Sequence, residues 1–137
     1  MTVLLDAFAL VAYFTDEPAA AEVQRLLWNG PAAISAVQVA EVVDRLARVV
    51  GVDPDEAEVA CSALGLELLP VSPHIGIAAG LLRSRHYGPT GRSLSLADCV
   101  CAATALFHDL PLATADPVLL AVVQHEGGTV IELPGSS

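Results

Sequence analysis

The chain has 137 residues, 54% of them hydrophobic, and its 16 acids against 6 arginines, with no lysine, give a formal net charge of −10. This length and apolar content predict one domain over residues 1–137 with its own core, and they exclude a disordered chain. The charge excludes a protein that wraps nucleic acid by bulk phosphate neutralisation, and the missing lysine excludes Schiff-base and P-loop chemistry.

The first part of the chain alternates short apolar runs with helical patterns. The run at residues 2–5 is short and apolar, as in a buried strand, and it stops at Asp6. Ser35 is a favourable helix N-cap and Gly51 a favourable helix stop. In this part we expect a strand at 2–5, helices at 7–14 and 17–28, a strand at 32–34 and a helix at 35–50.

The second part of the chain repeats the alternation. Asp53 before Pro54, and Ser72 before Pro73, are typical helix starts, each with an N-cap and a proline in the first turn. Here we expect helices at 53–65, 72–87 and 95–108, a helix that begins at 116–117, and strands at 66–71, 112–114 and 129–133. Strands alternating with helices predict an α/β domain with a short, mainly parallel central sheet and helices on both faces.

The cysteines and the apolar segments indicate a cytoplasmic protein. Cys61, Cys99 and Cys101 are odd in number and lack the spacing of a zinc knuckle, so we expect reduced thiols. The apolar N-terminus has no positive region and is interrupted by Asp6, which argues against a signal peptide. No apolar run reaches the roughly 18 residues of a membrane span, so we expect no membrane partner.

Four acidic residues lie where an ordinary fold would not place them. Asp6 and Asp116 directly follow predicted strands, while Glu41 and Asp98 lie early in apolar helical segments. Ligands of parallel sheets bind beyond the carboxyl ends of the strands, so we expect the four carboxylates to meet at that edge. Two carboxylates about 4 Å apart repel by about 4 kcal/mol at an effective dielectric near 20. Such a cluster raises its own pKa values or holds a divalent cation.

A site made only of carboxylates suits Mg²⁺ or Mn²⁺ better than zinc. Such an ion supports metal-assisted hydrolysis of a phosphodiester. Structural roles compete with this interpretation. Asp6 and Asp116 can be helix N-caps, and Glu41 can pair with Arg45 one turn on. Asp98 has the weakest structural explanation, because no cation lies within local helical reach.

Four short segments carry a resemblance to a known family: Val3–Leu10 (VLLDAFAL), Ala40–Val43 (AEVV), Leu94–Cys99 (LSLADC) and Ala113–Asp116 (ATAD). In order and spacing they resemble the four acidic motifs of the PIN-domain nucleases, and the chain is similar in length to the VapC-type toxins of toxin–antitoxin pairs. The resemblance covers nearly the whole chain.

The resemblance implies an endoribonuclease that depends on Mg²⁺, with Mn²⁺ able to substitute. It implies an RNA substrate, a small antitoxin as partner and a homodimer. Carried over to this sequence, it makes Asp6, Glu41, Asp98 and Asp116 the catalytic and metal-binding acids. It also makes Thr114 the hydroxyl beside the last acid.

Three arginines, at positions 83, 85 and 92, cluster around a loop rich in glycine and proline, with Tyr87 between them. We interpret them as a rim that contacts RNA phosphates, with Tyr87 as a stacking aromatic. The alternative is a solvated helix end, because cations there complement the helix dipole.

Other features have simpler interpretations. The four histidines lack metal-binding spacing, so we expect surface positions for His74, His86, His108 and His125. An apolar stripe on the first two helices is expected in the core, or partly in a groove for an antitoxin helix: Leu10, Phe14, Val23, Leu26, Leu27 and Trp28.

Two other functions also fit these features. One is a PIN-type RNA-processing nuclease without an antitoxin, and the other is a non-catalytic binding module of the same fold. A receiver-like switch and a haloacid-type phosphatase do not fit. The chain lacks the acid pair and lysine of the first and the D-x-D motif of the second.

Overall fold

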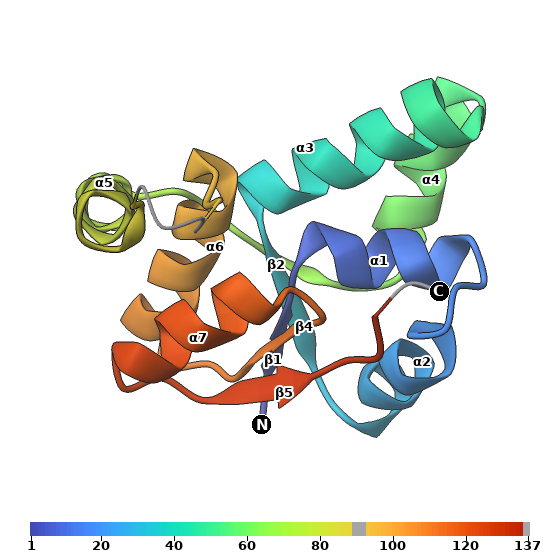
Figure 1. The fold of residues 1–137 in the computed structure, drawn as a ribbon. Helices are drawn as coiled ribbons and strands as arrows, with labels where there is room; N and C mark the ends of the chain where they lie inside the picture. Colours follow the sequence, from blue (N-terminus) through green and yellow to red (C-terminus); the bar gives the residue numbers. More distant parts are fainter. Residues whose placement is uncertain (89–92, 136–137) are drawn as a thin grey trace.

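Five parallel strands form one sheet in the order β3-β2-β1-β4-β5 in a computed structural model that describes residues 1–88 and 93–135 (Figure 1). Every neighbouring pair is parallel, so all the described strands end at the same edge of the sheet. The strands are β1 Val3–Leu5, β2 Ala32–Ser35, β3 Glu67–Leu69, β4 Leu112–Thr114 and β5 Val130–Glu132.

Within the described residues, seven α-helices connect and cover these strands (Figure 1). Ser35, Asp53, Ser72 and Ser95 each accept a backbone hydrogen bond as N-caps, which confirms the predicted starts. The helices are α1 Ala7–Phe14, α2 Ala20–Asn29, α3 Ala36–Asp44, α4 Pro54–Ala63, α5 Pro73–His86, α6 Leu96–Phe107 and α7 Pro117–His125.

Alternation along the strands divides the core between the two faces of the sheet. Val3 and Leu5 of β1 pack with α1, α2 and α4 on one face. Leu4 points the opposite way and packs with α5, α6 and α7 on the other face. The predicted α/β fold with helices on both faces is therefore confirmed (Figure 1).

Two helices differ from the sequence prediction. The second helix begins at Ala20 instead of residue 17, because turns at residues 15–16 and 18–19 come before it and Asp16 adopts a positive φ of 55°. The expected helix at 35–50 is α3 followed by a π-helical segment, η1, at Arg45–Val50. Gly51 ends it in the left-handed conformation, with φ of 90°, as the sequence predicts.

The apolar stripe of the first two helices is only partly in the core. Leu10 and Val23 are fully buried, and Leu26 and Leu27 pack against the same cluster. Trp28 is 76% exposed and does not lie in the core, so for this residue only the alternative, a groove for an antitoxin helix, stays a prediction. Trp28 lies at the last turn of α2, where the amphipathic pattern no longer faces the sheet. Within the described ranges, no helix combines the length and apolarity that crossing a membrane requires.

Candidate active site

Asp6 occupies the loop between the carboxyl end of β1 and the start of α1. Its Oδ1 caps α1 by accepting a hydrogen bond of 2.8 Å from the Ala9 N–H, and its Oδ2 accepts one from the Thr114 hydroxyl. The residue is only 5% exposed. Burial raises the pKa of Asp6 to about 6, against the lowering effect of these hydrogen bonds, and the charges of Asp98 and Asp116 raise it further.

Asp116 follows the neighbouring strand β4 and caps α7. Its Oδ1 accepts hydrogen bonds from Val118 N–H at 2.9 Å and Leu119 N–H at 3.4 Å. The Asp116 N–H donates to the Thr114 hydroxyl oxygen at 3.1 Å. Thr114 therefore joins Asp6 to Asp116, and the predicted cap uses one carboxylate oxygen only.

Asp98 lies in the first turn of α6 and completes a capping box. Ser95 Oγ accepts from the Asp98 N–H at 3.0 Å, while Asp98 Oδ2 accepts from the Ser95 N–H at 3.4 Å. Burial raises the pKa of Asp98, and the charge of Asp116 raises it further, although the Ser95 hydrogen bonds oppose this. Asp98 thus has a local structural partner that the sequence analysis did not identify.

Glu41 comes from α3 and is held by a residue that sequence reasoning missed. The amide of Gln38 donates to Glu41 Oε1 at 2.9 Å and to the Ala97 carbonyl at 3.1 Å. Its carbonyl oxygen accepts from the Ala7 N–H at 2.7 Å. Gln38 is 2% exposed and connects α1, α3 and α6.

The electrostatic surroundings of Glu41 link it to the other acids. Burial raises the pKa of Glu41, and the charge of Asp98 raises it further, while Arg45 and the Gln38 hydrogen bond lower it. The expected pairing of Glu41 with Arg45 is therefore an attraction between their two charges.

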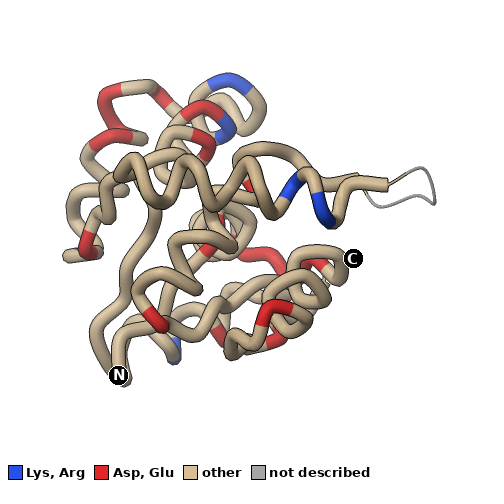
Figure 2. Tube along the Cα trace, turned by 90° about the vertical axis from the view of Figure 1, so that its left-hand side faces the viewer, with Lys and Arg blue, Asp and Glu red and all other residues tan. Residues whose placement is uncertain are grey.

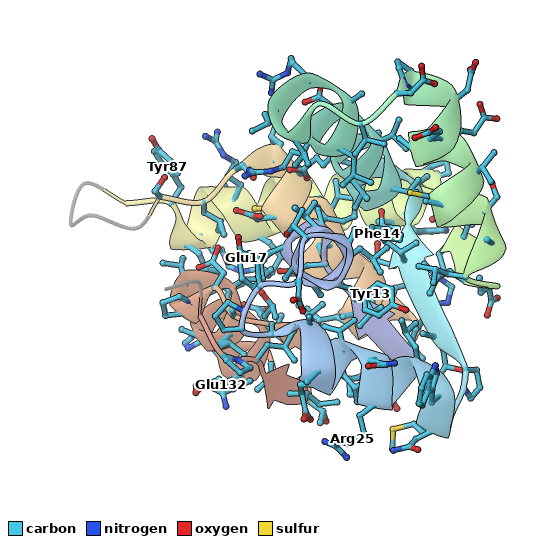
Figure 3. The ribbon with its side chains drawn as sticks, turned by 90° about the vertical axis from the view of Figure 1, so that its right-hand side faces the viewer. Tyr13, Phe14, Glu17, Arg25, Tyr87 and Glu132 are labelled. Carbon is cyan, nitrogen blue, oxygen red and sulfur yellow. The ribbon has the colours of Figure 1, made fainter. Side chains whose placement is uncertain are left out.

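All four predicted acids line one cavity of about 590 Å³ beyond the carboxyl ends of β1 and β4. Two further charged residues that the sequence analysis did not place there also line it. They are Arg45 and Glu17, which follows α1 in the turn toward α2 (Figure 3). The cavity therefore combines five carboxylates with one guanidinium, which makes it strongly negative.

The donors of this cavity fit Mg²⁺ or Mn²⁺. Its charged lining offers carboxylate oxygens, and neither histidine nor cysteine occurs among the described lining residues. Asp6 and Asp116 cap helices and Asp98 belongs to a capping box, each through one oxygen, which fixes the carboxylate and leaves its second oxygen for a cation or a neighbour. Mutual repulsion of these charges favours a bound cation.

The three arginines of the predicted RNA-contacting rim are placed elsewhere or lie outside the described residues. Arg83 donates to the Leu94 carbonyl at 2.9 Å, and its guanidinium lies 4.4 Å from the Tyr87 ring centroid. Arg85 pairs with Glu126 at 2.9 Å. Arg92 falls outside the described residues. A role in RNA contact stays a prediction for all three.

Charged residues, cysteines and histidines outside the cavity can also be compared with the sequence predictions. Acidic positions are spread over the trace, whereas basic positions fall in a few separate places (Figure 2). The three cysteines are free and buried. The predicted surface position of His86 is wrong, because this ring is 8% exposed and pairs with Glu126, forty residues away in sequence.

Comparison with known families and curated proteins gives one match. The model of the PIN domain family matches residues 3–125, which is most of the chain and includes all four acids. No curated protein matches the chain in sequence.

Solved structures share this fold over nearly the whole chain. A toxin–antitoxin complex from Klebsiella pneumoniae is 24% identical, with TM-score 0.71, covering 94% of this chain and 95% of that one. VapBC2 from Rickettsia felis, bound to promoter DNA, is 17% identical, with TM-score 0.72, covering 96% and 98%. VapC20 from Mycobacterium tuberculosis, a sarcin–ricin-loop-cleaving toxin, is 17% identical, with TM-score 0.71, covering 95% and 98%. At these identities the likeness is one of fold.

Proposed function

The chain belongs to the PIN domain family, and from this we propose that it is a divalent-metal-dependent endoribonuclease, the toxin of a toxin–antitoxin pair. The observation that carries the proposal is the convergence of Asp6, Glu41, Asp98 and Asp116 on one cavity. The folds of a solved toxin–antitoxin complex and of a toxin named for cleaving the sarcin–ricin loop support it.

We assign Mg²⁺ to this cavity, with Mn²⁺ as a substitute, because both ions take oxygen ligands. Asp6, Asp98 and Asp116 would hold the ion, with Glu41 beside them. When bound, such an ion lowers the pKa of a coordinated water and neutralises charge on a phosphoryl oxygen.

The chain's own residues position these groups for hydrolysis, in which water adds to phosphorus and a P–O bond breaks. Thr114 fixes Asp6 relative to Asp116 through its hydroxyl. Gln38 holds Oε1 of Glu41, so Oε2 is the oxygen that accepts a proton from water. The raised pKa of Glu41 makes it a stronger base than an ordinary glutamate.

Binding of RNA in a negatively charged cavity needs positive charge close to the substrate. With a net charge of −10, the protein repels RNA at long range, and a bound dication offsets part of the cavity's charge. Arg45 is the cation among the described lining residues, and we assign it to a substrate phosphate.

We assign an antitoxin and a second copy of the chain as protein partners, acting in the cytoplasm where the RNA target lies. Val49 and Val50 of η1 and Val59 of α4 are exposed on elements that pack together, which suits an antitoxin's apolar helix. Ile77 of α5 and Phe107 of α6 are exposed on two other helices that pack together, which suits a homodimer contact. Co-expression with the product of an adjoining small reading frame, followed by light scattering, tests both assignments.

The function is tested by RNA cleavage with purified protein. We expect cleavage with Mg²⁺ or Mn²⁺, none with EDTA, and a loss of about 100-fold or more in Asp98→Asn. Asp55→Asn, an exposed acid in the first turn of α4, is the matched control and keeps full activity. Equal cleavage by wild type and Asp98→Asn would overturn the proposal.

A further inference from the structure

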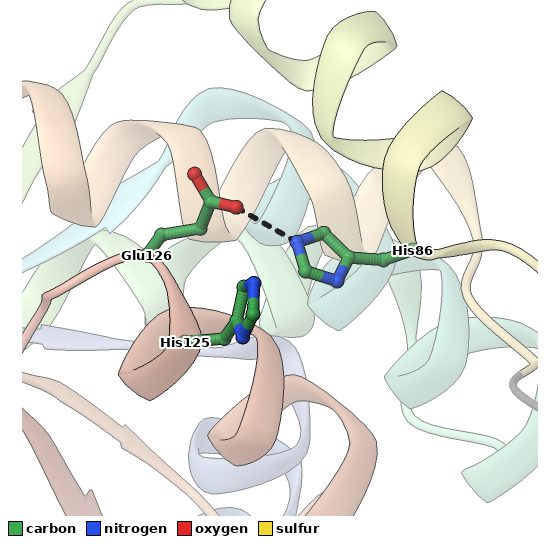
Figure 4. Close-up of side chains that lie close together, drawn as sticks. All are labelled: His86, His125 and Glu126. Carbon is green, nitrogen blue, oxygen red and sulfur yellow. Dashed lines mark hydrogen bonds and ion pairs between the residues drawn. The ribbon is translucent and has the colours of Figure 1, made fainter.

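A second group of potential ligands lies away from the acidic cavity, where two helices end. His86 is the last residue of α5, His125 is the last residue of α7, and Glu126 follows it (Figure 4). One ligand atom from each of the three lies within 4.8 Å of the other two. The helices come from distant parts of the sequence but cover the same sheet face.

From this geometry we infer a second metal site, in which His86, His125 and Glu126 bind a Zn²⁺-class transition-metal ion. Two imidazoles and one carboxylate form a mixed nitrogen and oxygen set, which suits Zn²⁺ rather than Mg²⁺. With three protein ligands, the fourth tetrahedral position takes water. The inference does not depend on the proposed nuclease function.

Electrostatics at this place favour a cation. The carboxyl ends of α5 and α7 both point their negative dipole ends toward the group. Hydrogen bonds from His86 and Arg85 lower the pKa of Glu126, so its carboxylate is charged at neutral pH. The overall charge of −10 adds to the attraction.

Glu126 already has hydrogen-bond partners that would orient its carboxylate beside an ion. Its Oε2 lies 2.8 Å from His86 Nε2, and its Oε1 accepts from Arg85 Nη2 at 2.9 Å. On metal binding, the ion replaces the proton that His86 Nε2 donates to Oε2, this proton leaves to solvent, and Arg85 keeps Oε1 and orients the carboxylate. The positive charge of Arg85 opposes the ion, which limits the affinity.

Rotation of the His125 side chain can bring the three ligands together around an ion. The His86 and His125 rings lie edge to face, with centroids 5.1 Å apart. His86 is buried, whereas His125 is exposed at a helix end, where rotation about its side-chain bonds can turn its ring toward the other two. A closed site cross-links the ends of α5 and α7 and stabilises the fold.

The test uses Co²⁺ as a spectroscopic probe on the untagged full chain, with excess Mg²⁺ to occupy the oxygen-lined cavity. We expect one equivalent with tetrahedral d–d absorption, displaced by Zn²⁺, and a Zn²⁺ melting shift of about 3–5 °C at ten times Kd. Asp98→Asn, which changes the acidic cavity, should bind Co²⁺ like wild type. Because the proposed Co²⁺ site is separate from that cavity, absence of Co²⁺ binding would leave the nuclease proposal untouched.

Two variants decide whether these residues are the ligands. His125→Ala removes an exposed side chain and should weaken Co²⁺ binding by at least about tenfold. His108→Ala, an exposed histidine after α6, is the matched control and should bind like wild type. Equal binding by His125→Ala and wild type, or no Co²⁺ binding by wild type, overturns the inference.

Discussion

The side-chain amide of Gln38 donates to Oε1 of Glu41 at 2.9 Å, and the same amide group reaches α6 through the Ala97 carbonyl. A buried glutamine thus fixes an acid of the candidate site relative to two other helices. Its two amide hydrogens and its carbonyl oxygen all have partners, so it matches a deprotonated Glu41 without an unpaired polar atom.

Gln38→Glu tests this relationship with little change in size. A carboxylate cannot donate to Glu41 or to the Ala97 carbonyl, so we expect the free energy of unfolding to fall by about 1–3 kcal/mol. The added charge also raises the pKa of Glu41, which moves the pH profile of cleavage upward. Urea denaturation and the pH profile are the measurements. Gln24→Glu on α2 is the control, and equal effects of both changes would contradict the role of Gln38.

Asp6 makes the stability of the metal-free protein depend on pH. Its pKa is about 6 in the folded protein and 3.8 in the unfolded chain, so folding binds the proton more tightly. The stabilisation that comes from the raised pKa of Asp6 is fully present below pH 3.8. It is lost as the pH rises through 6, and the free energy of unfolding falls by up to about 3 kcal/mol.

The measurement is unfolding of wild type and Asp6→Asn in EDTA between pH 4 and 7. Asparagine keeps an oxygen to cap α1 but carries no charge. We expect the advantage of Asp6→Asn over wild type to grow across this range. A constant difference between the two proteins would show that Asp6 keeps an ordinary pKa.

Thr114 holds two acids through one hydroxyl group, so its removal should affect both. Thr114→Val has nearly the same shape but leaves the Asp116 N–H without its partner and removes a hydrogen bond from Asp6. We expect a loss of about 1–3 kcal/mol in unfolding free energy and a further rise in the pKa of Asp6. Thr114→Ser keeps the hydroxyl and should recover most of the Mg²⁺-dependent cleavage; failure of this rescue would contradict the account.

Divalent ions should stabilise the wild type by relieving the repulsion between carboxylates. At about ten times Kd, Mn²⁺ should add about 1.4 kcal/mol, which is a rise of several degrees in Tm. Asp98→Asn should melt no lower than wild type without metal, because asparagine still accepts from Ser95, and should respond little to Mn²⁺. Asp55→Asn should respond like wild type. A wild type that ignores Mn²⁺, together with a destabilised Asp98→Asn, would make Asp98 purely structural.

Local signals in the sequence were sufficient for much of the fold and for the acids. Serine and proline at helix starts, short apolar strands and Gly51 act within a few residues, so the pattern along the chain contains them. Asp6 and Asp116 each follow a strand, and their meeting at the carboxyl edge of the sheet is predictable because parallel strands end at the same edge. Asp98 and Glu41 were predicted from their apolar surroundings, and both line the cavity.

Contacts between distant segments were not predictable in the same way. Gln38 has partners 31 and 59 residues away, and only its position three residues before Glu41, on the same helical face, hinted at its role. The buried ring of His86 pairs with Glu126, forty residues away, and the helix expected at 35–50 becomes π-helical from Arg45. No local pattern encodes these relationships.

The central claim is that the acids of this cavity bind a divalent ion for RNA hydrolysis, and diffraction from crystals grown with Mn²⁺ tests it most directly. The account predicts an anomalous Mn²⁺ peak bound by carboxylate oxygens of Asp6, Asp98 and Asp116 in wild type, lost in the catalytically inactive Asp98→Asn. A cavity without a peak, at Mn²⁺ concentrations that saturate the thermal response, would contradict it.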